Sequence, residues 1–237
     1  VFPKDVKRRL DATVVKLPKT LKEKISFRSQ HLKEYQSISL ANKYTKFVDK
    51  FKGTEIGEAV AEGYHKVLSY KDEYEVARLH KKTAVKLRNE FAGNMKITYH
   101  LSPPLISRIS SNGRPLKREF GSFIENIFGI LSKFKFLRGS IFDPFGYSAE
   151  RKMERSLIEQ YEKDLEGLLE KNSLNTELAV SLARLPMQIR GFGPVKKSNY
   201  DSAMIRRKEL LKLLEEEHVK WPSAETTENI FKSSEHG

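Results

Sequence analysis

The sequence contains no cysteine among its 237 residues. Disulfide bonds are therefore impossible within this chain, and so are zinc sites and iron–sulfur clusters held by its own thiolates. The sequence also lacks any apolar run that approaches the roughly 18 residues that a membrane-spanning helix needs. These two absences predict a protein of the reducing cytoplasm that has no membrane partner.

The short motifs that mark common enzyme classes are also missing. There is no Gly-x-Ser-x-Gly nucleophile elbow, no phosphate-binding Walker loop and no Gly-x-Gly-x-x-Gly dinucleotide fingerprint. The six histidines are scattered, and none forms a helical pair at the spacing of metal ligands. We therefore expect no catalytic residue, no metal site and no cofactor bound by a recognisable motif, so that the chain alone is not catalytic.

Acidic residues are scarce at the start of the chain. Residues 1–52 contain 14 basic and 5 acidic residues, and the whole chain carries a net charge of +13. Such a basic arm either is a solvated linker or attracts nucleic acid, anionic lipid or an acidic protein. A basic helical module that binds nucleic acid is therefore the alternative function, and a steep loss of affinity with salt would identify it.

Apolar spacing predicts a mainly helical fold with one small β element. Helices are expected at residues 26–52, 56–68, 83–91, 120–134, 149–171, 176–184 and 195–218, and residues 70–79 either extend the second helix or start a third. Residues 95–101 alternate apolar and polar side chains, which is typical of a half-buried strand, and residues 105–109 are either its partner or a short helix.

The ends of the chain differ from its middle in composition. We expect residues 1–25 to form a basic connector, residues 26–220 a mainly helical domain and residues 221–237 a polar tail.

The stretch from Lys133 to Tyr161 combines an aromatic-rich turn with a long amphipathic helix. Pro144 fixes one backbone angle of the turn, and Gly146 permits a positive φ. We expect Asp143, Pro144, Gly146 and Tyr147 to be structural, and Phe142 or Phe145 to be buried beside the apolar stripe of the helix. Arg151 and Glu154 belong to the charged, solvated face of that helix by their spacing.

The corner at residues 190–197 is the candidate ligand site of the sequence. Gly191 and Gly193 expose backbone amides ahead of a helix N-terminus, and Arg190, Lys196 and Lys197 add positive charge, which together favour an anion. Two alternatives stay open. Either this corner binds an anion such as a phosphate of coenzyme A, or it is a helix-to-helix corner in which Arg190 pairs with a carboxylate such as Glu154.

Five strings along the chain occur in the order found in a known family. They are YKDEYEVARL (residues 70–79), HLSPPL (100–105), GRPLKREFG (113–121), KFLRGSIFDPFGYSAERKMERSLIEQY (135–161) and LARLPMQIRGFGPVKKSN (182–199). Together they resemble the C-terminal region of the large single-chain indolepyruvate ferredoxin oxidoreductases, and the resemblance covers residues 20–218.

This resemblance implies a parent enzyme that oxidatively decarboxylates an aryl pyruvate to an acyl-CoA. It implies thiamine diphosphate, iron–sulfur clusters and coenzyme A as cofactors of that enzyme, and ferredoxin as its electron acceptor. The partners implied for this chain are the catalytic modules, on the same polypeptide or on another subunit, and a mate in a homo-oligomer. No catalytic residue carries over to this chain, so the role implied for it is structural or assembly-related.

Overall fold

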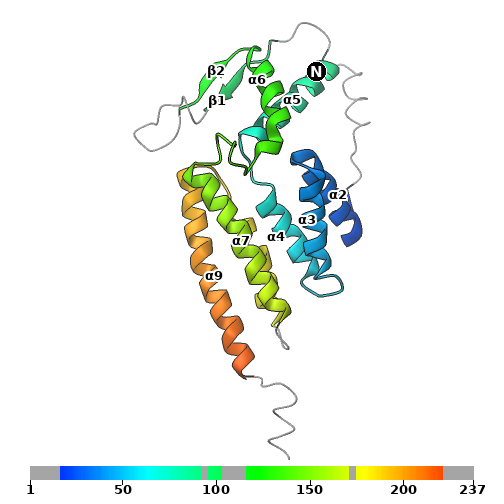
Figure 1. Ribbon diagram of the computed structural model, residues 1–237, viewed down its shortest axis with the longest axis vertical. Helices are drawn as coiled ribbons and strands as arrows, with labels where there is room; N and C mark the ends of the chain where they lie inside the picture. The colour runs from blue at the N-terminus through cyan, green and yellow to red at the C-terminus, as the bar shows by residue number, and fades with distance from the viewer. Residues whose placement is uncertain (1–16, 92–95, 103–115, 171–174, 221–237) are drawn as a thin grey trace, which may run out of the picture. The chain divides into compact units, whose positions relative to one another are not determined.

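The structure is a computed structural model that describes residues 17–91, 96–102, 116–170 and 175–220 (Figure 1). These residues are mainly helical and contain one small antiparallel sheet, as predicted. The expected polar tail and most of the expected basic connector lie outside the described residues. Among the described helices, none combines the length and the apolar character needed to cross a membrane.

The chain forms two compact units. One unit contains residues Val1–Ala41 and Tyr70–Ser148, and the other contains Asn42–Ser69 and Ala149–Gly237. The elements described in the first unit are α2 (Leu21–Tyr35), the start of α3 (Ile38–Asp49), α5 (Glu73–Glu90), β1 (Tyr99–Leu101), β2 (Arg118–Phe120), α6 (Ile124–Lys133) and the 3₁₀ helix η1 (Phe134–Leu137). The second unit contains the rest of α3, α4 (Gly57–Leu68), α7 (Ala149–Leu169), α8 (Thr176–Arg184), the 3₁₀ helix η2 (Leu185–Gln188) and α9 (Pro194–Lys220).

The helix predicted over residues 26–52 is two helices. α2 begins at Leu21, inside the expected connector, because Thr20 and Glu23 form a reciprocal capping box at its N-terminus. Gln36 then leaves the helical conformation, and α3 restarts behind Ser37, whose hydroxyl accepts a hydrogen bond from the Leu40 amide at 3.2 Å.

The β element consists of two short strands. The first lies within the strand predicted at residues 95–101, and the second was not predicted. β1 and β2 are antiparallel, with Tyr99 opposite Phe120 and Leu101 opposite Arg118. The assignment of Phe120 to a helical face is wrong, because a strand of three residues is too short to show a period of two. The alternatives for residues 105–109 fall outside the described residues.

The core of the second unit surrounds α4, which is buried on nearly all sides. Tyr161 of α7 donates a hydrogen bond to the Ala183 carbonyl of α8 at 2.9 Å, and this contact lies directly over Gly63 of α4. A Cβ atom at Gly63 would clash with that carbonyl and would lie 2.5 Å from the Tyr161 hydroxyl. The close approach of α4 to α8 therefore requires glycine at this position.

We predict that Gly63→Ala destabilises the chain by about 1–3 kcal/mol, because the new methyl group overpacks the contact between α4 and α8. Gly167→Ala in α7 is the matched control, since a Cβ atom there would meet nothing within 4 Å. The control should gain about 0.5–1 kcal/mol from helix propensity. Denaturant unfolding measures both changes, and equal stability of the two variants would contradict the packing described here.

Candidate functional site

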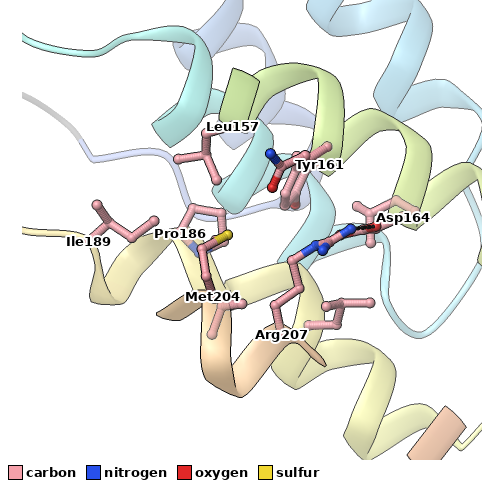
Figure 2. A pocket seen from close by; sticks show the side chains of 11 residues that line it. Leu157, Tyr161, Asp164, Pro186, Ile189, Met204 and Arg207 are labelled. Carbon is pink, nitrogen blue, oxygen red and sulfur yellow. Dashed lines mark hydrogen bonds and ion pairs between the residues drawn. The ribbon is translucent and has the colours of Figure 1, made fainter. Parts of the chain in front are cut away.

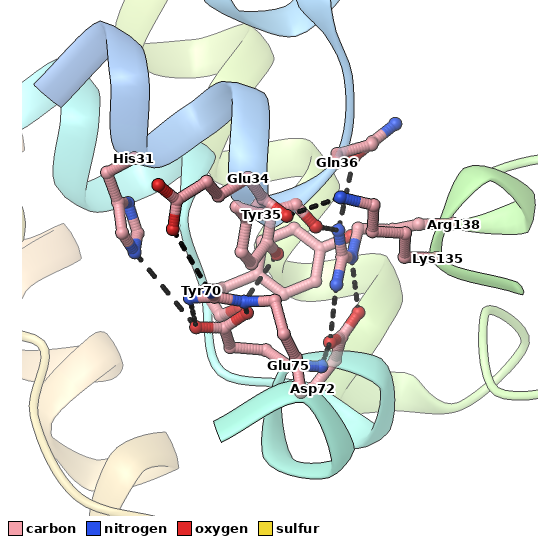
Figure 3. Close-up of polar contacts among 10 residues, drawn as sticks. His31, Glu34, Tyr35, Gln36, Tyr70, Asp72, Glu75, Lys135 and Arg138 are labelled. Atoms are coloured by element: carbon pink, nitrogen blue, oxygen red, sulfur yellow. Dashed lines mark hydrogen bonds and ion pairs between the residues drawn. The ribbon is translucent and has the colours of Figure 1, made fainter. Parts of the chain in front are cut away.

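The first unit is built around a buried arginine at the end of η1. The Arg138 side chain forms a fork with Asp72, with Nε 2.5 Å from Oδ2 and a terminal nitrogen 2.8 Å from Oδ1 (Figure 3). Its other terminal nitrogen donates to the Tyr35 carbonyl at 3.0 Å, and the guanidinium lies 3.7 Å from the centre of the Tyr35 ring. Both charged residues are buried, with 6% and 3% of their surfaces exposed.

Asp72 also begins α5. Its carboxylate accepts a hydrogen bond from the Glu75 amide at 2.9 Å, so it caps the helix while it holds Arg138. Burial by itself lowers the pKa of the Arg138 guanidinium, but the hydrogen bonds to Asp72 raise it above its ordinary value overall. We call this pair, Arg138 with Asp72, the arginine lock. It fastens the end of η1 to the start of α5 and the end of α2.

Further ion pairs surround the arginine lock. Arg78 donates two hydrogen bonds of 2.8 Å to the Glu75 carboxylate and one of 3.4 Å to Glu34. Lys135 donates to the Glu34 carbonyl at 2.5 Å (Figure 3), and its pKa is lowered by burial and by the nearby arginines. These hydrogen bonds from Arg78 and Lys135 all go to acceptors of the protein itself, so the cluster holds the unit together.

The turn that follows the arginine lock has a polar interior. Asp143 is 3% exposed and accepts hydrogen bonds from the Gly139 amide at 2.9 Å, the Phe145 amide at 3.1 Å and the Tyr74 hydroxyl at 3.1 Å. A Cβ atom at Gly146 would lie 2.9 Å from the Asp143 carboxylate. Gly146 is therefore required for space and not for the positive φ that we predicted, which belongs to Gly139 at +75°.

Asp143 fills the inside of the turn, so three large apolar side chains of the turn point outwards. Ile141, Phe142 and Tyr147 are 76%, 73% and 63% exposed. We predicted that Phe142 or Phe145 is buried, and Phe142 is not. Phe145 is half-buried and packs edge-on against Tyr74, with ring centres 5.4 Å apart. We call Ile141, Phe142 and Tyr147 the exposed apolar face of the turn.

In the second unit, the corner predicted to bind an anion has both of its glycines at positive φ, +97° at Gly191 and +54° at Gly193. The Arg190 side chain is exposed, and its Nε donates to the Met187 carbonyl at 2.8 Å. Lys197 pairs with Asp201 along α9. The anion site stays a prediction.

The carboxylate expected to pair with Arg190 is held by other cations. Glu154 contacts Lys196 of the corner and Arg151 of its own helix, and Lys196 also lies 3.2 Å from Glu150. Arg151 and Glu154 are buried, so their assignment to the solvated face of α7 is wrong. Burial raises the pKa of the Glu154 carboxyl, while Arg151 and Lys196 oppose that rise.

A narrow pocket lies beside this corner in the second unit. It is lined by apolar side chains, among them Leu157, Pro186 and Met204, and is bounded by two hydrogen bonds of 2.5 Å from Arg207 to Asp164 (Figure 2). Its volume of about 10 Å³ holds about one water molecule. This pocket is a packing gap that is too small for a substrate. In the part of the chain that the structure describes, no group of three or more His, Asp or Glu side chains is placed to hold a metal ion.

A model of a family of unknown function (DUF6537) matches residues 21–209. No curated protein and no solved structure matches the chain. The matched range includes both the arginine lock and the corner at residues 190–197.

We predict that Asp72→Asn destabilises the chain by about 3–5 kcal/mol. Asparagine keeps the cap of α5 but leaves the Arg138 charge buried without a counter-charge. Phe142→Ala, in the same unit, should change the free energy of unfolding by less than about 0.5 kcal/mol because that ring is exposed. Chemical denaturation compares the two, and a larger loss for Phe142→Ala would contradict the assignment of inside and outside in the turn.

Tyr74 gives a test at alkaline pH. Burial raises the pKa of its hydroxyl above the ordinary value, and the charge of Asp143 raises it further. A raised native pKa gives stability that is present below the unfolded value of about 10 and is lost as the pH rises towards the native value. At neutral pH we expect Tyr74→Phe to be about 1–3 kcal/mol less stable than the wild type, because Asp143 loses a donor. This difference should shrink above pH about 10. If unfolding experiments above pH about 10 show the same difference as at neutral pH, the pKa of Tyr74 is not raised in the native state.

Proposed function

We propose that this chain, which belongs to the family of unknown function DUF6537, is an accessory docking domain of a 2-oxoacid:ferredoxin oxidoreductase of the indolepyruvate type. In this proposal the parent enzyme converts an aryl pyruvate to an acyl-CoA and passes electrons to ferredoxin in the cytoplasm. The five ordered strings support the choice of enzyme class. The chain has no thiolate with which to hold an iron–sulfur cluster, so we assign the clusters to the catalytic modules.

The observation that carries the docking role is the exposed apolar face of the turn. Three large apolar side chains stand in solvent on a turn whose backbone is fixed from within by Asp143. A patch of this kind is typical of an interaction surface. Because the turn is already held in shape, little conformational entropy is lost when a partner covers it.

The occupant that we propose for this face is a catalytic module of the same enzyme. The face lies within residues 135–161, the longest of the five strings that resemble that enzyme family. An enzyme that excludes water from its reacting centre needs its modules to pack closely against one another. A fixed apolar protrusion on an accessory domain provides such packing without any catalytic group of its own.

We predict that Phe142→Asp in the assembled enzyme weakens its association with the catalytic modules at least about tenfold, because a charge would be buried in an apolar contact. Turnover of the 2-oxoacid should fall with the association. The melting temperature of the chain should not change, since Phe142 contributes little to its core. Co-purification and analytical ultracentrifugation measure the association, and a dye-reduction assay measures turnover.

Phe27→Asp is the matched control, because Phe27 is an exposed phenylalanine on α2 of the same unit. It should leave both association and turnover unchanged. Normal association of Phe142→Asp and Ile141→Asp would contradict the docking role of the turn. If the chain did not associate with any such catalytic module even as wild type, the choice of enzyme class would be wrong.

A further inference from the structure

A groove between α5 and α6 of the first unit is lined by none of the residues of the turn or of the corner at residues 190–197. The two helices pack side by side in the first unit (Figure 1) and run in opposite directions. The start of α5 is joined to the residue after η1 by the arginine lock, and its last turn is joined to the first turn of α6 by Arg88 and Glu125 at 2.7 Å. The groove opens along about two turns of each helix and encloses about 490 Å³.

The groove is preformed because its two walls share a packed base. Ala77 of α5 packs with Ile124 and Phe128 of α6, and Tyr99 of β1 completes this cluster. Tyr99 also donates a hydrogen bond to Glu125 at 3.0 Å, which fixes the carboxylate that Arg88 grips. A partner would therefore meet walls that are already in place.

Gly129 lies at the bottom of the groove and has no side chain to fill it. It lies in the middle of α6, where glycine lowers helix stability relative to alanine. Unlike Gly63 and Gly146, it has no close neighbour, because a Cβ atom there would meet nothing within 4 Å. Nothing in the packing of the described residues requires glycine here. Its effect is to leave the space over α6 open.

Each wall of the groove has an exposed apolar side chain. Val85 of α5 is 51% exposed, and Ile130 of α6 is 57% exposed. Ile130 belongs to a stripe of exposed apolar side chains that continues along α6 and into η1 at helical spacing. The other members of the stripe are Phe123, Ile127 and Phe134. This spacing of four, three and four residues matches the seam that one helix presents to another.

The rim of the groove is positively charged. Lys81 of α5 and Lys133 of α6 line it, and among the described residues neither lysine has a carboxylate at ion-pair distance. Arg88 adds a third cation, whose charge is balanced by Glu125. An occupant that complements this rim carries negative charge beside its apolar side chains.

From these observations we propose that the groove between α5 and α6 binds an acidic amphipathic helix of a partner protein. An apolar channel between two helices is the surface that an amphipathic helix fills, and the low floor at Gly129 lets the backbone of that helix come close. The lysines of the rim would pair with carboxylates that flank its apolar stripe. This inference does not depend on the proposed function, because it uses a different surface and holds for any parent protein.

The test uses the full chain and a synthetic helical peptide with leucine at the a and d positions and glutamate at the e and g positions. A second peptide carries lysine in place of every glutamate. Fluorescence anisotropy at physiological ionic strength should show saturable binding of the acidic peptide and none of the basic one. Gly129→Leu fills the groove, and we expect it to weaken binding at least about tenfold without lowering the melting temperature. The double variant Lys81→Glu with Lys133→Glu should have a similar effect.

Matched controls come from α7. Gly167→Leu places the same side chain at another helical glycine with open space around it, and Lys163→Glu reverses an exposed charge. Both should bind the acidic peptide as the wild type does. Absence of binding would overturn the proposal. Binding that Gly129→Leu leaves unchanged would also overturn it, because the peptide would then bind by nonspecific attraction to a basic chain. Self-association that Gly129→Leu abolishes would make a second copy of this chain the occupant, and would overturn the proposal as well.

Discussion

The buried fork between Arg138 and Asp72 is the interaction on which the first unit depends. It joins segments that are far apart in the sequence, because Asp72 starts α5, Arg138 follows η1, and Tyr35 at the end of α2 supplies a carbonyl to the same guanidinium. Burying two charges is costly unless hydrogen bonds satisfy them. Here the two charges are satisfied by the fork, the Tyr35 carbonyl and the capped amide together. The free-energy cost of burying the charges is therefore offset only when α2, α5 and η1 are arranged as in this structure.

The functional proposals follow from what this arrangement leaves in solvent. The turn begins directly after Arg138 and is filled by Asp143, so its apolar side chains have no place inside it. At the other end of α5, the groove against α6 is open over Gly129. α5 therefore supports two different surfaces. The exposed apolar face of the turn lies near its start, and the groove with a basic rim lies towards its end. Both have the properties of contact surfaces.

The sequence predicts the elements of this fold better than their contacts. Apolar spacing predicted the mainly helical class because that signal is local, and it left open whether residues 70–79 extend the second helix or start a third, which the structure decides for a third helix, α5. Glu154 is buried although its spacing predicted a solvated position, and Phe142, one of the two candidates for a buried phenylalanine in the turn, is exposed. Each is decided by a residue distant in sequence or by a buried carboxylate, and spacing within one helix or turn contains no information about such partners. Nothing local marks Arg138 as the partner of Asp72.

Hydrogen exchange tests the central claim most directly, because it reports whether the exposed apolar face of the turn is covered in the enzyme assembly that we propose. The exchange of backbone amides in residues 139–148 would be compared between the chain alone and the chain assembled with the catalytic modules. Our account predicts that these amides become more protected on assembly, while those of the buried helix α4 do not change. Equal exchange of residues 139–148 in both states would contradict it.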